Sequence, residues 1–220
     1  MPKSKANRLS RVLTLAVVTV FSSLLSSPTF ADTGAIGVLV IPSGTLALTT
    51  PDPANNWVLP CDELDGVVLA PDSPAPIPAS EIQVGVRNNN NGPVPNATVV
   101  VEFNQGPIQL CPNGVFTAIT NEQGIAYLTL AGGGCLSETP LSAVIKANGV
   151  TIRNYANVKS PDFDGSGADL VVNLADLVQF SAEFLGNGPA VCHDYDNNGT
   201  TDLGDLIIFS PAFVAGAHCP

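Results

Sequence analysis

The segment 194–205 most limits the local structure and the kind of site that this 220-residue chain can form, because oxygen-bearing side chains recur in it around a single central glycine. A hard divalent cation takes six to eight oxygen ligands at short range, and alternating acidic residues let a curled backbone aim their side chains inward. Gly199 at position six permits the sharp turn that such a twelve-residue loop requires. Position twelve is Asp205 rather than the usual Glu, and its shorter reach affects affinity. The expected calcium ligands are Asp194, Asp196, Asn198, the carbonyl of Thr200, Asp202 directly or through water, and Asp205.

A second copy of this loop lies upstream. Residues 162–167 repeat its first half and residues 172–176 its second half, with three extra residues, 168–170, near the middle. An isolated acidic cluster is more often a solvated turn, but two aligned copies indicate a duplicated calcium unit. We expect two Ca²⁺ ions, the tighter one in 194–205, unless the insertion lets Asp169 join the upstream site. The expected upstream ligands are Asp162, Asp164, Ser166, Asn173 and Asp176.

The repeat continues beyond the loops, since residues 176–184 align with 205–213. In both copies Leu, Phe and Phe recur three and four positions apart, which places them on one face of a helix. We therefore expect two short helices that bury these stripes against each other. The stripes are Leu177, Phe180 and Phe184 in the first copy, and Leu206, Phe209 and Phe213 in the second.

This duplicated pattern resembles the type I dockerins over about 60 residues, with Asp-x-Asp/Asn-x-Asp/Asn-Gly followed by Asn-x-x-Asp-Leu. The resemblance implies an EF-hand-like α-helical domain whose calcium ligands are the residues named above. It also implies a cohesin as partner, but the positions that read the partner differ from the family. Leu174-Ala175 and Leu203-Gly204 stand where dockerins usually carry Ser/Thr pairs, and no Lys or Arg follows Lys159. Cohesin binding is therefore the alternative to a more general role in assembly.

Residues 1–31 have the pattern of a secretory signal peptide. A basic front precedes an apolar run of about 14 residues, which is shorter than the roughly 20 residues that cross a bilayer. Small residues before Asp32 form the expected cleavage site, so we predict an exported, extracellular or cell-surface chain with no membrane span. Removing the signal leaves four basic residues against nineteen acidic ones, a net charge of −15, which argues against nucleic acid as a partner. Residues 162–220 hold nine of these acids and no Lys or Arg, which independently favours bound cations.

Five cysteines remain after cleavage, and export permits disulfides. Cys192 and Cys219 bracket the second repeat, so we expect a bridge between them that stabilises by roughly 3–4 kcal/mol. Cys111 and Cys135 flank a hairpin-like stretch and are expected to pair across it. Cys61 is left over, and the sequence leaves open whether it is free or displaces one of these partners.

Apolar and polar residues alternate between residues 35 and 158 with the period of half-buried strands. Asn-Gly pairs at 91–92, 113–114 and 148–149 are expected to supply positive φ angles at turns, and 71–78 is a Pro-rich connection. Short strands at this spacing predict an antiparallel β-sandwich. The inward positions are Ile82, Val84, Val86, Ala97, Val99, Val101, Phe103, Ala126, Leu128, Leu130, Ala143, Ile145 and Ala147.

The segments 91–99, 120–126 and 143–150 resemble the bacterial immunoglobulin-like domains of the invasin and intimin type, over about 75 residues. Such domains are spacers and adhesion modules, and the resemblance implies no catalytic residues. Residues 33–78 lie largely outside it and are expected to add strands. The predicted organisation is a mainly β immunoglobulin-like sandwich over 32–159 followed, at Ser160-Pro161, by the dockerin-like domain over 160–220.

Catalytic readings have little support. The two histidines, His193 and His218, each adjoin a cysteine, but their spacing fits no common zinc pattern. The sequence has no Ser-His-Asp set, and the acids outside the loops are scattered. Trp57 and Tyr127 could stack on a sugar, although a lone aromatic is more often a core residue. The sequence thus predicts a non-enzymatic, calcium-binding assembly or adhesion module. The alternatives are a cohesin-binding component of a cellulosome-like polysaccharide-degrading complex and, less favoured, a carbohydrate-binding module or a small hydrolase.

Overall fold

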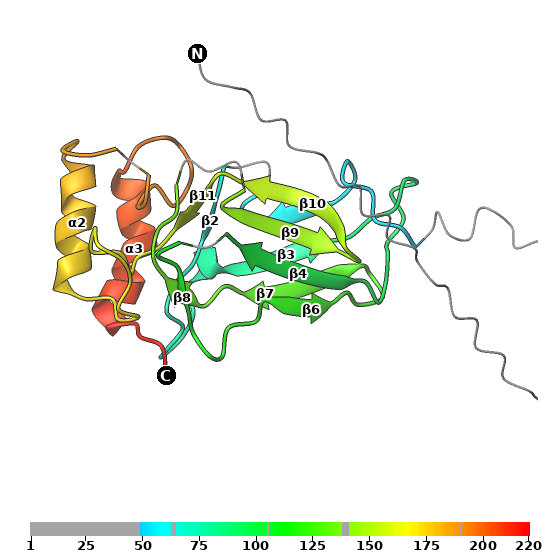
Figure 1. Cartoon of the computed structure of the whole chain (residues 1–220), viewed down its shortest axis with the longest axis horizontal. Coiled ribbons are helices and arrows are strands. Elements are labelled where there is room, and N and C mark those ends of the chain that lie inside the picture. The colour runs from blue at the N-terminus through cyan, green and yellow to red at the C-terminus, as the bar shows by residue number, and fades with distance from the viewer. Residues whose placement is uncertain (1–48, 63–64, 105, 138–140, 190) are drawn as a thin grey trace, which may run out of the picture. The chain divides into compact units, whose positions relative to one another are not determined.

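The computed structural model describes residues 49–62, 65–104, 106–137, 141–189 and 191–220 (Figure 1). The expected signal peptide, 1–31, and the following residues up to 48 lie outside the described residues. The described part is mainly β and belongs to one compact unit. None of its helices has the length and apolar character to cross a membrane. In chain order the elements are β1 (Trp57–Leu59), β2 (Gly66–Val68), the 3₁₀ turn η1 (Pro78–Ser80), β3 (Glu81–Gly85), β4 (Thr98–Phe103), β5 (Gln109–Leu110), β6 (Thr117–Ile119), β7 (Ile125–Thr129), β8 (Gly132–Gly133), β9 (Ala143–Ala147), β10 (Val150–Tyr155), β11 (Asn157–Lys159), α2 (Leu174–Phe184) and α3 (Leu203–Ala215).

Two antiparallel sheets, β1-β3-β7 and β10-β9-β4-β6, make up most of the β region. Alternation decides which side chains of each strand turn inward: Val84 lies opposite Ala126 and Ile82 opposite Leu128, and all four are buried. Inward residues of both sheets belong to a single hydrophobic core. The strands β3, β4, β7 and β9 therefore lie where the period-two pattern predicts them.

Two smaller pairs complete the β region. β2 lies in the segment that was expected to carry extra strands, and it pairs in parallel with β11. β5 and β8 form a short antiparallel pair. Both pairs contact the C-terminal acidic segments: Asp162 accepts from the amide of Gly134 beside β8, and Lys159 of β11 lies next to Asp194.

The turn predictions are correct at two of three sites. Asn91 and Asn148 have φ of 59° and 48°. At Asn113-Gly114 neither residue has a positive φ, so that prediction is wrong. A Cβ on Gly114 would lie 2.4 Å from the Phe116 ring, so glycine provides room there rather than conformational freedom.

The two helices pack side by side through their aromatic stripes (Figure 1). Phe180 and Phe209 are buried, and their rings stack with centroids 4.9 Å apart. Phe184 departs from the expectation, because it lies at the end of α2 and stays 38% exposed. The core between the helices also includes Val68 and Ile77 of the β region, so the helix pair and the strands share buried surface.

The expected disulfide pairing is wrong, although the same four cysteines are bridged. Cys111 pairs with Cys219, and Cys135 pairs with Cys192, with Cα–Cα distances of 5.3 and 5.5 Å. The register of β5 and β8 explains the first error, because the Cys111 amide donates to the carbonyl of Ala131, which places Ala131 rather than Cys135 opposite it. Both bridges therefore join the β region to the C-terminal segment. Cys61 is free and buried, with its sulfur 3.5 Å from the Tyr155 hydroxyl.

Candidate metal centre

The segment 194–205, called loop 2, brings three carboxylates together. One oxygen each from Asp194, Asp196 and Asp205 lies within 4.8 Å of the others. Asp194 and Asp205 are buried, whereas Asp196 is exposed. Asp205 stands in the first turn of α3, where its carboxylate accepts hydrogen bonds from the amides of Tyr195 (2.6 Å) and Asp202 (2.8 Å). The first turn of α3 thus brings the Asp205 carboxylate next to those of Asp194 and Asp196.

Side-chain hydrogen bonds link the middle of loop 2 to these carboxylates. Asn198 donates to Asp196 (3.1 Å) and to Asp202 (3.2 Å), and its own side-chain oxygen accepts from the Thr200 hydroxyl (2.6 Å). Gly199 has φ of 89°, as the sharp turn at position six requires. All six residues predicted for this site therefore lie in one hydrogen-bonded loop. The side-chain oxygens of these residues belong to carboxylate, amide and hydroxyl groups, and oxygen ligands are what Ca²⁺ prefers.

The upstream segment 162–176, called loop 1, is built around Asp162, which is fully buried. Its carboxylate oxygens accept from the amides of Asp169 (3.2 Å) and Leu170 (3.0 Å), and its carbonyl accepts from the amide of Gly134 (2.8 Å). A Cβ on Gly133 would lie 1.7 Å from Asp162 Oδ2, so only glycine permits this approach. The run Gly132-Gly133-Gly134 is the sequence signal of this contact, which the spacing of the acidic residues does not reveal.

The remaining acids of loop 1 are held in separate local structures. Asp164 accepts from the Ser166 hydroxyl at 2.6 Å and amide at 2.8 Å, and these bonds lower its pKa. Asp176 accepts from the Asn173 amide at 2.7 Å. Asn173 also donates to Asp169 (3.3 Å), so the insertion does bring a carboxylate to the second half of the loop. Among the described residues, the three-carboxylate convergence occurs in loop 2 only.

Burial leaves several of these carboxyl groups costly to ionise. It raises the pKa of Asp162 to about 7, with a further contribution from the neighbouring carboxylates of Asp176 and Asp169. Burial likewise raises the pKa of Asp176 and of Asp205. A bound cation would favour the ionised form of each group.

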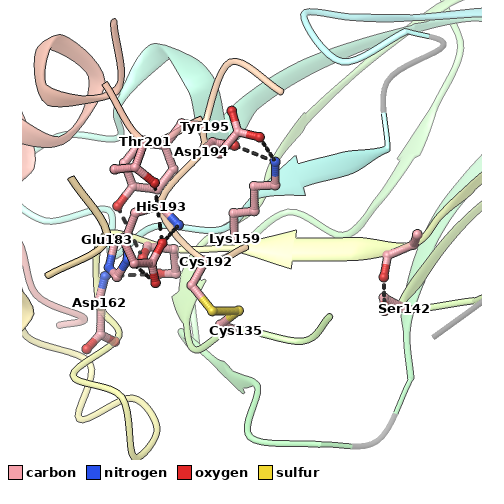
Figure 2. The surroundings of a disulfide bond; sticks show 12 residues. Cys135, Ser142, Lys159, Asp162, Glu183, Cys192, His193, Asp194, Tyr195 and Thr201 are labelled. Atoms are coloured by element: carbon pink, nitrogen blue, oxygen red, sulfur yellow. Dashed lines mark hydrogen bonds and ion pairs between the residues drawn. A yellow bond between two sulfur atoms is a disulfide. The ribbon is translucent and has the colours of Figure 1, made fainter. Parts of the chain in front are cut away.

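One residue next to loop 2 was not expected from the sequence. Lys159, the last residue of β11, is 1% exposed, and its ammonium group lies 3.1 Å from Asp194 Oδ2 (Figure 2). In the sequence, Lys159 stands out only as the last basic residue of the chain. Nothing in the local pattern indicates its contact, because Asp194 follows 35 residues later.

Zinc binding finds no support at the histidines. The four cysteines near them are oxidised in disulfides, and a disulfide sulfur is not a thiolate ligand. His193 is buried with Nδ1 3.0 Å from Glu183 Oε1, and the same carboxylate accepts from the His193 amide (3.2 Å) (Figure 2). His218 lies in the C-terminal tail, where its amide donates to the carbonyl of Ser73 (2.9 Å). The His218 ring lies with Nδ1 3.1 Å from the carbonyl of Gly216, so the two rings belong to separate structural contacts.

Trp57 and Tyr127, the two aromatic residues considered for sugar binding, also lie in different surroundings. The Trp57 indole covers Gly85, where a Cβ would lie 2.0 Å from the ring, so one ring face packs on the sheet. Tyr127 lies opposite Gln83 on the same sheet and is 59% exposed. Trp57 therefore has the packing role expected of a lone aromatic.

Comparison with known proteins adds no assignment to this geometry: no protein-family model matches the chain, and no curated protein matches it.

Proposed function

We propose that this chain is an exported, non-enzymatic module that binds two Ca²⁺ ions through loops 1 and 2 and serves protein assembly or adhesion. The observation that carries the proposal is the convergence of Asp194, Asp196 and Asp205 within 4.8 Å. Calcium would be held in loop 2 by these three residues with Asn198, Thr200 and Asp202, and it would neutralise carboxylates that otherwise repel one another. The two disulfides are compatible with export.

The fold supports the same reading. Two antiparallel sheets around one core are compatible with an immunoglobulin-like sandwich, and two stacked helices, each preceded by an acidic loop, are compatible with a dockerin-like pair. Each helix begins with the same capping box, Asn173 with Asp176 and Asp202 with Asp205. This repetition favours one role for both loops.

Calorimetric titration of the mature chain, residues 32–220, tests the calcium assignment. After treatment with a chelator, we expect two binding events, because both loops present oxygen donors. Asp194→Asn should remove the tighter event and Asp162→Asn the weaker one, since only loop 2 shows the full convergence. Glu122→Gln is the matched control, because it removes one negative charge from an exposed turn of the β region. Absence of heat at millimolar calcium contradicts the assignment, and equal losses from the two Asp variants contradict the ranking.

The assembly role is supported by apolar side chains that the helices leave exposed at equivalent positions. Leu174 and Val178 of α2 are 67% and 64% exposed, and Leu203 and Ile207 of α3 are 66% and 72% exposed. Contiguous exposed apolar patches mark surfaces that contact protein partners, and these four side chains occupy equivalent positions on two adjacent helices. The partner that the dockerin resemblance implies is a cohesin. Capture of the chain by immobilised cohesins with calcium, and its loss in Ile207→Ser, supports that alternative; no capture by a cohesin panel leaves the wider assembly role as the proposal.

A further inference from the structure

The ammonium group of Lys159 lies at the inner side of loop 2, with its side chain 1% exposed. It donates to Asp194 Oδ2 at 3.1 Å and also to the carbonyl of Asp194 (Figure 2). It donates in addition to Asn197 Oδ1 at 2.8 Å. Asp65 Oδ1, on the exposed side, lies 3.7 Å away. One buried cation from the β region thus contacts the first and fourth residues of the loop.

Strand β2, which pairs with β11, leaves room for this contact. Lys159 pairs with Val68 across the parallel β2–β11 ladder, and Asn197 donates to the carbonyl of Gly66 (3.3 Å). A Cβ on Gly66 would lie 3.0 Å from both Asn197 Oδ1 and Lys159 Cε, which is closer than most side-chain contacts. Loop 2 is therefore held against the β region by Lys159 and by the glycine beside it.

Loop 1 has no equivalent cation. In the described parts of the chain, no Lys or Arg nitrogen lies within ion-pair distance of Asp162, Asp164 or Asp176. The carboxylate of Asp162 is bonded to backbone amides instead. The two copies of the loop therefore differ in charge as well as in length.

We propose that Lys159 is the internal counter-ion of loop 2: it keeps the loop folded without calcium and lowers the affinity of the loop for calcium. This inference rests on the proposed calcium function. In the metal-free chain, the ammonium group neutralises Asp194, whose side chain is 5% exposed. When calcium binds, the same buried ammonium group cannot withdraw and repels the divalent ion. Removing the charge should thus weaken the metal-free fold and strengthen calcium binding.

The test compares the mature wild-type chain with Lys159→Met and Lys159→Gln, which retain much of the length of the side chain and remove its charge. Lys146→Met is the matched control, because Lys146 forms an exposed ion pair with Glu102 on the β region. The metal is calcium alone, measured by calorimetry or by competition with a chromophoric chelator. Even in water, one charge several Å from a divalent ion changes binding by about tenfold. We expect the loop 2 affinity to rise by that factor in both Lys159 variants, with loop 1 unchanged.

Stability in excess chelator provides an independent readout. The urea midpoint of Lys159→Met should fall below that of Lys146→Met, and added calcium should restore most of the difference. A Lys159 variant that is unfolded in chelator and folds with calcium supports the counter-ion role through stability, because its apparent calcium affinity then includes the free energy of folding. In a variant that is folded in chelator, an unchanged or lower loop 2 affinity overturns the proposal, and so do variants that stay unfolded even at saturating calcium. Absence of calcium uptake by the wild-type chain refutes the proposed function itself, and with it this inference.

Discussion

The disulfide pairing makes a prediction that can be tested without any knowledge of function. Residues 32–220 contain four basic residues, Arg87, Lys146, Arg153 and Lys159. Complete trypsin digestion under denaturing, non-reducing conditions therefore leaves Cys111 and Cys135 together in peptide 88–146. It likewise leaves Cys192 and Cys219 together in peptide 160–220. With the bridges Cys111–Cys219 and Cys135–Cys192, the two peptides stay covalently joined until a reductant is added.

The contribution of the disulfides to the free energy of unfolding follows from the lengths of chain that the two bridges close. Cys135–Cys192 spans 57 positions, and chain entropy assigns about 4 kcal/mol to such a loop. Cys111–Cys219 spans 108 positions but encloses the first bridge, so it closes only about 50 further residues and also contributes about 4 kcal/mol. Each pair replaced by alanine should therefore lower the free energy of unfolding by about 4 kcal/mol.

Urea unfolding followed by the fluorescence of Trp57 measures this loss, and Trp57 reports on the β region. Cys61→Ala is the control, because it removes a buried thiol that has no bridge and should cost about 1 kcal/mol. Two separate peptides before reduction, each closed by its own internal bridge, would refute the pairing. A loss below about 1 kcal/mol in both double variants would refute the entropic reasoning.

Three further outcomes follow from single side chains. Phe209→Ala removes a ring that is 1% exposed and stacked on Phe180, so it should lower the free energy of unfolding by about 3–5 kcal/mol, measured with urea at saturating calcium. A loss below about 1 kcal/mol would contradict the stacked core. Gly133→Ala places a Cβ 1.7 Å from Asp162 Oδ2, so calorimetry should show weaker calcium binding in loop 1 alone. Gly188→Ala is the control, because its Cβ would lie 3.9 Å from the nearest atom, Glu183 Cγ, and it should leave calcium binding unchanged. Normal calcium binding in Gly133→Ala would count against the contact. The pKa of Asp162 is raised to about 7 from 3.8, so its contribution to the stability of the metal-free chain is complete below about pH 4 and is lost as the pH rises through 7. Thermal melts in chelator should show this decline, Asp162→Asn should lack it, and an identical slope in both proteins would argue against this cause.

The sequence by itself identifies the features that neighbouring residues encode. Alternation places Ile82 and Val84 in the core because side chains of a strand point to opposite faces at every step. The three- and four-residue spacing of Phe180 and its repeat Phe209 predicts the stacked helix pair for the corresponding reason in a helix. The oxygen pattern of loop 2 is likewise local, since its twelve residues carry both the turn and the donors.

Only the tertiary structure decides which distant residues meet. The pairing of Cys111 with Cys219 depends on the register of β5 against β8, and a shift of that register would present different residues to the C-terminal tail. The contact of Lys159 with Asp194 depends on how α3 and its loop dock on the β2–β11 ladder. Likewise, Gly133 is needed only because Asp162 approaches it from another part of the chain. These contacts arise from packing between segments whose own local patterns are satisfied without one another, so no local period or spacing records them.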